Sequence, residues 1–324
     1  MTRCVLSGVP LVLVAVAMLS TATGSGDARA GAQDTPQTTF RSGASAVTVD
    51  VSVRDRSRRA ITGLKATDFQ VFDNGVLQRV DDVSYGKLPI DITVALDVSH
   101  SVTGALLDRL RQGVVQLMRD LGPQDRLKLV LFNMRIMRTI DWTNDAKAVE
   151  RAIRGASAGG GTALLDAVSV TLVSGSAPDR RQLIVFFTDG SDSSSTTPPS
   201  VLTGIAQRTR ATLTFVMPSQ LRVPIVDSRG RTTTFATTGG APLARAPLYP
   251  LFATLARETG GAILPVGPSA DLSATFRKVL GDFRSAYVLY YTARGVEQRG
   301  HHTIEVKVNR DGAQVQARRG YFGS

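Results

Sequence analysis

Oxygen-bearing side chains follow three segments of the chain that are apolar or rich in glycine. The apolar run at residues 90–98 leads into a D-x-S-x-S segment at 97–101, which offers one carboxylate and two hydroxyls. A threonine follows the glycine run at 159–161, and an aspartate follows the apolar run at 182–188. In open α/β sheets, ligands bind at the carboxyl ends of the parallel strands. We therefore expect one site that is formed by Asp97, Ser99, Ser101, Thr162 and Asp189.

These five side chains offer only oxygen atoms to a ligand. Such hard donors suit Mg²⁺, which prefers octahedral oxygen coordination and keeps some of its waters. Two carboxylates that meet without a cation repel each other, so one of them tends to stay protonated. A divalent ion removes that conflict. Because the set leaves a coordination position open, a partner protein could supply an acidic side chain to the metal.

The segments between these loops alternate between strand and helix character. Strands are predicted at 90–98, 127–132, 135–141, 182–188, 212–217 and 262–266, and helices at 103–121, 144–154, 163–174, 199–210, 248–259 and 269–284. This alternation is typical of a doubly wound, mostly parallel, Rossmann-like α/β sheet with helices on both faces. Residues 218–247 interrupt it with no period, which indicates a functional or disordered loop.

Both ends of the α/β segment are flanked by strand patterns. At the N-terminal side, valines alternate with polar residues over 47–54, and strands are predicted at 67–72 and 76–84 around an Asn74-Gly75 turn. At the C-terminal side, strands are predicted at 287–291, 304–308 and 313–319. Neither flank could bury its apolar face alone. We therefore expect the two flanks to pair into one small accessory β-domain.

The N-terminus has the pattern of a signal peptide. Arg3 precedes an apolar run at 11–19, and Ala28-Arg29-Ala30 resembles a cleavage site. We expect an exported protein that is periplasmic, bound to the cell envelope or secreted, with no transmembrane segment after cleavage. The predicted organisation is a signal peptide at 1–30, a flexible leader at 31–44, a β-segment at 45–88, the α/β domain at 89–284 and a second β-segment at 285–324.

The composition narrows the range of partners. The apolar fraction of 43% supports a full hydrophobic core, and the formal net charge is +11. Because the Lys and Arg residues are scattered, we expect no specific nucleic-acid binding, and an anionic surface is at most a secondary partner. Cleavage would remove Cys4, the only cysteine, and with it any disulfide or thiolate ligand.

The site pattern resembles that of the von Willebrand factor A (VWA) family and its metal-ion-dependent adhesion site. The resemblance covers residues 89–284, and the whole chain, with its Ala317-Arg318-Arg319-Gly320-Tyr321 ending, also looks like exported VWFA-related bacterial proteins. It implies Mg²⁺ or Mn²⁺ at the site, and adhesion to or assembly with a protein partner. The 218–247 segment departs from the family pattern, which leaves the partner open.

Motifs that would indicate catalysis are missing from the sequence. Residues 155–162 lack the lysine of a phosphate-binding loop, and no G-x-G-x-x-G fingerprint follows the apolar run at 90–98. His301 and His302 are adjacent, so on a strand they face opposite sides, and Asp192 is expected to be a solvated loop residue. We therefore predict a non-catalytic binding module with no catalytic residues. Two alternatives stay open: an exported Mg²⁺-dependent hydrolase that uses the same oxygen cluster, and a structural envelope protein with a vestigial metal site.

Overall fold

The computed structural model describes residues 46–323 except for 176, 220–223, 227–231 and 235–246. The expected signal peptide and leader therefore lie outside the described residues, as does most of the 218–247 segment. Among the described residues, no helix is both long enough and apolar enough to span a membrane.

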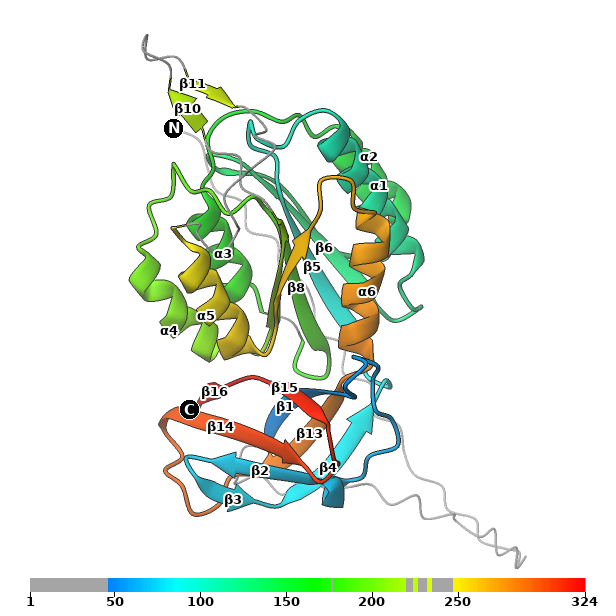
Figure 1. Ribbon diagram of the computed structural model, residues 1–324, viewed down its shortest axis with the longest axis vertical. Coiled ribbons are helices and arrows are strands. Elements are labelled where there is room, and N and C mark those ends of the chain that lie inside the picture. Colours follow the sequence, from blue (N-terminus) through cyan, green and yellow to red (C-terminus); the bar gives the residue numbers. More distant parts are fainter. Residues whose placement is uncertain (1–45, 176, 220–223, 227–231, 235–246, 324) are drawn as a thin grey trace, which may run out of the picture. The chain divides into compact units, whose positions relative to one another are not determined.

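A six-stranded sheet forms the centre of the α/β part (Figure 1). Its strand order is β12-β9-β8-β5-β6-β7. The strands are β5 (Ile90–Asp97), β6 (Arg126–Phe132), β7 (Ile136–Thr143), β8 (Arg181–Phe187), β9 (Thr212–Pro218) and β12 (Ile263–Val266). Neighbouring strands are parallel except at the edge, where β7 runs antiparallel to β6. Every residue of β5 and β8 is buried, which explains why their sequences are mostly apolar.

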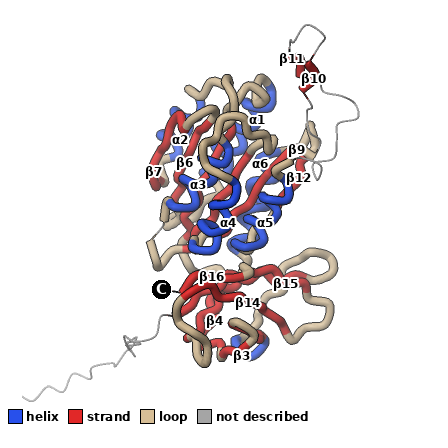
Figure 2. The backbone as a smooth tube through the Cα atoms, turned by 90° about the vertical axis from the view of Figure 1, so that its left-hand side faces the viewer, coloured by secondary structure: helices blue, strands red, loops and turns tan. Residues whose placement is uncertain are grey.

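Helices cover both faces of this sheet, as the sequence predicts (Figures 1 and 2). On one face α1 (Ala105–Arg119), α2 (Ala146–Arg154) and α6 (Leu272–Arg284) pack over the strands in one core cluster. On the other face a second cluster contains α3 (Leu164–Val173), α4 (Pro199–Arg208) and α5 (Tyr249–Thr259). Asp145 and Asp271 accept hydrogen bonds from backbone amides at the starts of α2 and α6, so both helices begin at capping carboxylates.

The predicted pairing of the two flanks is confirmed. One four-stranded sheet has the order β15-β1-β13-β4, in which strands from the two ends of the chain alternate. The other has the order β16-β14-β2-β3, in which the C-terminal strand β14 pairs with the N-terminal strand β2. These strands are β1 (Ala46–Arg54), β2 (Phe69–Asp73), β3 (Val76–Gln78), β4 (Val80–Tyr85), β13 (Tyr287–Thr292), β14 (Gly300–Val308), β15 (Gln314–Ala317) and β16 (Gly320–Gly323). A short 3₁₀ helix, η1 (Ala66–Asp68), precedes β2. A separate core cluster fills the space between the sheets.

Three details of the strand prediction are wrong. The strand expected at 76–84 divides at Arg79 into β3 and β4, which join different sheets. The strand expected at 313–319 ends at Ala317 as β15, and β16, which joins the other sheet, was not predicted. Next to the division at Arg79, the buried Gln78 side chain forms two hydrogen bonds of 2.9 Å with the backbone of Arg294. These bonds fix the place where the chain passes from one sheet to the other. Within 218–247, two three-residue strands, β10 (Pro224–Val226) and β11 (Thr232–Thr234), pair where no regular structure was expected. Strands this short cannot show a period in the sequence.

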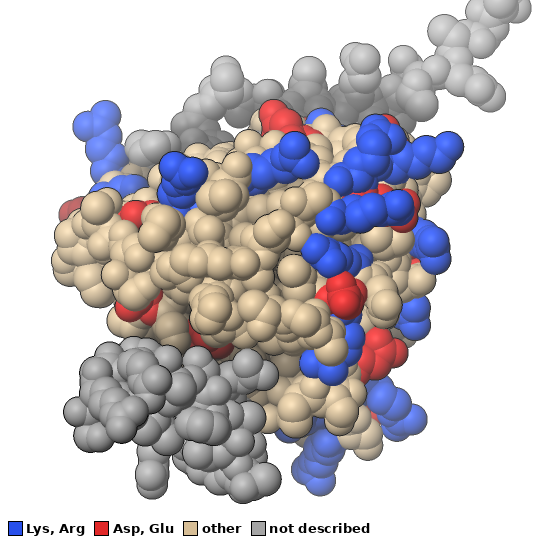
Figure 3. Space-filling model, turned by 90° about the horizontal axis from the view of Figure 1, so that it is seen from above, with Lys and Arg blue, Asp and Glu red and all other residues tan. Residues whose placement is uncertain are grey.

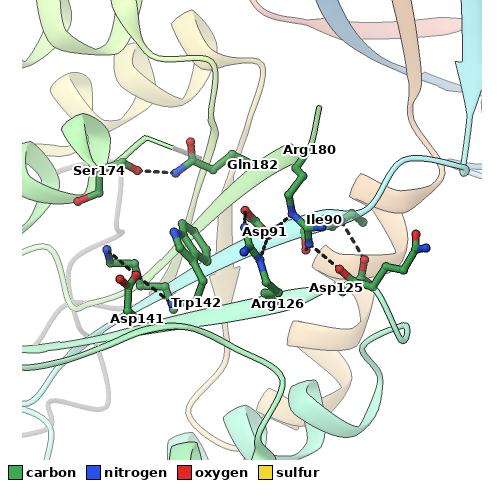
Figure 4. Close-up of polar contacts among 11 residues, drawn as sticks. Ile90, Asp91, Asp125, Arg126, Asp141, Trp142, Ser174, Arg180 and Gln182 are labelled. Atoms are coloured by element: carbon green, nitrogen blue, oxygen red, sulfur yellow. Dashed lines mark hydrogen bonds and ion pairs between the residues drawn. The ribbon is translucent and has the colours of Figure 1, made fainter. Parts of the chain in front are cut away.

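A buried ion-pair cluster lies at the amino end of β5, at the opposite end of the strand from Asp97 (Figure 4). The fully buried Asp91 carboxylate accepts hydrogen bonds from Arg126 Nε at 3.0 Å and from Arg180 Nε at 2.6 Å. Arg180 also donates to the carbonyl of Gln124 at 2.6 Å, and Asp125 accepts from the backbone of Ile90 at 2.9 Å. These contacts fasten two chain segments, residues 124–126 and Arg180, to the start of β5, so we assign Asp91 a structural role.

The C-terminal Arg318 fastens the last strands to helix α4. The residue is 8% exposed. Its guanidinium donates to the carbonyl oxygens of Thr209 and Gln207 at 3.0 and 3.4 Å, where α4 ends, and to that of Gly320 at 2.5 Å. A cation at a helix C-terminus is favoured by the helix dipole. Gly320 is required beside it because a Cβ there would collide with the carbonyl of His302. The Ala317-to-Tyr321 motif of the sequence is thus explained by packing.

Candidate functional site

Asp97 is the last residue of β5 and lies at the carboxyl edge of the central sheet. It is fully buried. One carboxylate oxygen accepts a hydrogen bond from the amide of Ser99 at 2.9 Å, and the other accepts from the hydroxyl of Thr188 at 2.9 Å. Thr188 follows the neighbouring strand β8, so the parallel pairing of β5 and β8 positions this contact. Asp97 is therefore held rigidly between two of the three predicted loops.

The electrostatic environment of Asp97 is unfavourable for its charged form. Burial, followed by the negative charge of Asp189, raises the pKa of Asp97 to about 6. Hydrogen bonds from Ser99 and Thr188 offset part of this effect. The two aspartates are thus close enough to interact, and a buried carboxylate in such a position favours either a proton or a cation beside it.

Ser99 and Ser101 place their hydroxyls next to each other. Their Oγ atoms are 3.1 Å apart, Ser99 is 2% exposed, and Ser101 is half-buried. The amide of Val102 donates to the carbonyl of Ser99 at 3.0 Å, which closes a turn between them. His100, between the two serines, is exposed. The turn therefore brings two hydroxyl oxygens together with the carboxylate of Asp97 on the same loop.

The glycine run holds Thr162 against the first loop. The amide of Gly159 donates to the carbonyl of Val98 at 2.9 Å, and the amide of His100 donates to the carbonyl of Gly160 at 3.1 Å. Gly160 has a φ of +78°, a conformation that favours glycine. Thr162 itself is 4% exposed. This backbone pairing brings the Thr162 loop beside residues 97–101.

A second set of contacts joins Thr162 to the loop after β8. The amides of Ser193 and Ser194 donate to the carbonyl of Thr162 at 2.8 and 3.0 Å, and the amide of Thr162 donates to Ser193 Oγ at 3.0 Å. Asp189, on the same loop, is half-buried and accepts from the amide of Ser191 at 2.9 Å. Hydrogen bonds and the charge of Asp189 thus connect the three loops that carry the five predicted residues.

Sequence reasoning missed several residues that support these loops. Asp192 is half-buried rather than solvated: its carboxylate accepts from the amide of Leu165 at 2.9 Å and from that of Ser195 at 3.2 Å. It therefore ties the loop after β8 to the start of α3. Asn133 donates from Nδ2 to the carbonyl of Gly159 at 2.8 Å. The run of Asp, Ser and Thr over 188–197 was the available signal, since such side chains commonly bind nearby backbone amides.

Gly190, in the same loop, provides a test of how tightly the loop is packed. Its φ is +82°, and an added Cβ would collide with Cε of Met217. We expect Gly190→Ala to lower the free energy of unfolding by about 1–3 kcal/mol, because of the strained backbone and the overpacking. Chemical denaturation measures this loss.

Gly281→Ala is the matched control for that measurement. Gly281 lies exposed in α6 with no atom within 4 Å of its added Cβ. The control should gain about 0.5–1 kcal/mol from helix propensity. Equal stability of the two variants would show that the loop after β8 is not packed as described.

Several solved structures are similar to this chain. The chain is similar to an aerotolerance-related membrane protein from Bacteroides fragilis, with 16% identity, a TM-score of 0.45 and coverage of 60% of this chain and 98% of that one. A von Willebrand factor type A protein from Catenulispora acidiphila has 12% identity, a TM-score of 0.46 and coverage of 87% of this chain and 75% of that one. The mussel byssus proximal thread matrix protein 1, whose metal-ion-dependent adhesion site (MIDAS) is occupied by zinc, has 12% identity, a TM-score of 0.44 and coverage of 65% of this chain and 49% of that one.

A family model identifies the central part of the chain. The model of the von Willebrand factor type A domain matches residues 92–191, which include all five predicted site residues. Residues 92–191 thus match the von Willebrand factor type A domain, and they lie within the doubly wound α/β fold that the sequence predicts.

Proposed function

We propose that this protein binds a divalent cation, Mg²⁺ or Mn²⁺, through Asp97, Ser99, Ser101, Thr162 and Asp189. The observation that carries the proposal is the buried Asp97 carboxylate, whose pKa is raised by burial and by the charge of Asp189. A cation there would neutralise both carboxylates, and the paired hydroxyls of Ser99 and Ser101 supply further hard oxygen ligands. Among the described residues no group of three His, Cys, Asp or Glu could hold a metal, so hydroxyls are needed to complete the set.

We further propose that the metal recruits a protein partner and that the site is not catalytic. VWA domains bind protein partners, and an open metal position would accept an acidic side chain from one. Neither histidine of the C-terminal flank supports a catalytic relay at this edge. His301 is exposed on β14, and the buried His302 contacts Asp73 in the accessory sheets. Adhesion or assembly is thus the function that the site supports best.

The proposal includes export of the chain. The apolar run at 11–19 and the Ala28-Arg29-Ala30 segment support a signal peptide at 1–30, which would deliver the mature chain to the periplasm, the cell envelope or the medium. We propose a VWA domain at 89–284, between the β-segments at 45–88 and 285–324.

Thermal unfolding of the 31–324 chain in EDTA, Mg²⁺ and Mn²⁺ tests the metal site. Metal at about ten times its dissociation constant should add roughly 1.4 kcal/mol to the free energy of unfolding, which at this size raises Tm by a few degrees. The rise should vanish in Asp97→Ala and persist in Asp311→Ala, which removes an exposed carboxylate from a remote turn. The absence of any rise in the parent would favour a vestigial site instead.

A further inference from the structure

A corner of the central sheet, formed by Met134, Arg135, Met137 and Arg138, lies beside the proposed metal site. We call it the β7 corner. The preceding strand β6 ends at Phe132, which pairs with Asp97, and Asn133 then binds the Gly159 carbonyl. Met134 Cγ and Cε lie 3.7 Å from the position that a Cβ would take on Gly160. The corner is therefore in contact with the loop that carries Thr162.

Two exposed methionines give this corner an apolar surface. Met134 is 55% exposed and Met137 is 48% exposed, which places both among the few exposed large apolar side chains of the described residues. The pairing of β7 with β6 shifts register between Leu131 and Phe132, so Met137 is the extra residue of a bulge. Bulges beside functional sites redirect side chains, and exposed methionines adapt to varied partner surfaces.

The charge around the corner is positive and is not neutralised locally. Residues 126–154 contain seven Lys and Arg but three Asp and Glu, a net charge of +4. All three acidic side chains are engaged elsewhere: Asp141 with Lys128, Glu150 with Arg154, and Asp145 at the start of α2. Arg135 and Arg138 are exposed, and among the described residues no ion pair involves either of them.

The view onto this end of the molecule agrees with that distribution. Lys and Arg gather on the right-hand side, which is the side of α1 and α2 in Figure 1, next to a largely uncharged surface (Figure 3). An acidic partner would be attracted to this side, and its carboxylates can form paired hydrogen bonds with arginine.

We propose that the β7 corner is the docking surface for an acidic segment of a partner protein that also carries apolar side chains. Its carboxylates pair with Arg135 and Arg138, and its apolar side chains pack on Met134 and Met137. A second copy of this chain does not fit, because its net charge of +11 opposes the corner. A nucleic acid fits poorly as well, since the corner offers no aromatic ring for base stacking.

The inference rests on the proposed function in that another carboxylate of the same partner would reach the metal. The probe is a displayed library of random 12-residue peptides, selected on the 31–324 chain in Mg²⁺ at low salt. Selected peptides should be enriched in Asp, Glu and apolar residues. Their affinity is then measured by fluorescence anisotropy for the parent and for variants.

Two double variants of the corner and one matched control decide the result. Arg135→Glu/Arg138→Glu should weaken the selected peptides by about tenfold or more, as expected for two reversed charges at an interface. Met134→Ser/Met137→Ser should weaken them by about three- to tenfold through lost apolar contact. Arg79→Glu/Arg310→Glu, which reverses two exposed arginines of the accessory sheets, should change affinity less than about twofold.

The metal dependence separates this inference from the proposed function. If peptide binding is lost in the corner variants but persists in EDTA and in Asp97→Ala, the docking surface is supported and the metal proposal fails. If peptide binding is lost in Asp97→Ala but is unchanged in both corner variants, the metal proposal is supported and the docking surface is refuted. A selection without acidic enrichment, or equal losses in the control variant, also overturns the docking surface.

Discussion

Asp97→Asn is expected to stabilise the metal-free protein above pH 6 and to abolish its stabilisation by Mg²⁺. The pKa of Asp97 is raised from 3.8 to about 6, so between these values the folded state holds a proton that the unfolded state has lost. The free energy of unfolding therefore falls as pH rises through this window, and above pH 6 the full penalty, on the order of 3 kcal/mol, is present. An amide removes the penalty.

The net gain in this variant is smaller than the whole penalty. Asp97 accepts hydrogen bonds at both oxygens, from Ser99 and from Thr188, and an amide can accept only at its one oxygen. The loss of one hydrogen bond removes about 1 kcal/mol, which leaves an expected gain of about 1–2 kcal/mol at pH 8 in EDTA. At pH 4 the gain should disappear.

Urea denaturation at pH 4 and pH 8, with EDTA or Mg²⁺, measures these differences. Asp311→Asn serves as the control, because this carboxylate is exposed in a remote turn. In Mg²⁺ at pH 8 the parent should regain the stability that it loses through the buried charge of Asp97. The stability of the variant should not change with Mg²⁺. A variant that is less stable than the parent in EDTA at pH 8, or that is stabilised by Mg²⁺, would contradict this description of the site.

Asp73→Ala is expected to lower the free energy of unfolding by about 3–5 kcal/mol. The fully buried Asp73 carboxylate contacts His302 Nδ1 at 2.7 Å and accepts hydrogen bonds from the hydroxyls of Tyr291 and Tyr321 at 2.9 Å each. Burial raises the pKa of both tyrosines, so their hydroxyls remain protonated donors. Without Asp73, three buried polar groups lose a partner.

The same contacts explain why this loss affects the accessory sheets as a whole. Asp73 ends β2, and its three partners come from β13, β14 and β16, so one carboxylate connects both four-stranded sheets. Chemical denaturation measures the loss, and Glu305→Gln, at an exposed pair with Lys307, should change stability by less than about 1 kcal/mol. A loss below 1 kcal/mol in Asp73→Ala would show that the cluster does not hold the two sheets together.

Much of the α/β part could be predicted because its signals are local. Strands β5 and β8 are buried on both faces, which makes their sequences mostly apolar, and the buried face of helix α1 forms an apolar stripe. The candidate site could be predicted partly for the same reason, since two of its three loops directly follow such strands at one sheet edge. The alternation at 47–54 and the Asn74-Gly75 turn likewise identified β1 and the β2–β3 hairpin.

The accessory sheets could not be predicted in detail because their organisation depends on contacts between distant residues. The sequence predicts that Gln78 lies within a single strand. Only its contact with Arg294 shows where the chain passes from one sheet to the other. The sequence indicates only that His301 and His302 face opposite sides of a strand, and it does not show that His302 is buried against Asp73, more than two hundred residues away in the chain. Asp192 was misjudged because its role depends on the amide of Leu165, which only folding brings close.

A calorimetric titration of the 31–324 chain with Mn²⁺ at pH 8 tests the central claim most directly. One Mn²⁺ should bind per chain in the parent, and binding should be undetectable in Asp97→Ala and strongly weakened in Ser99→Ala, while Asp311→Ala should bind as the parent does. Affinity should also fall below pH 6, where a proton competes for Asp97. Absence of binding in the parent, or equal binding in Asp97→Ala, would contradict the proposed metal site.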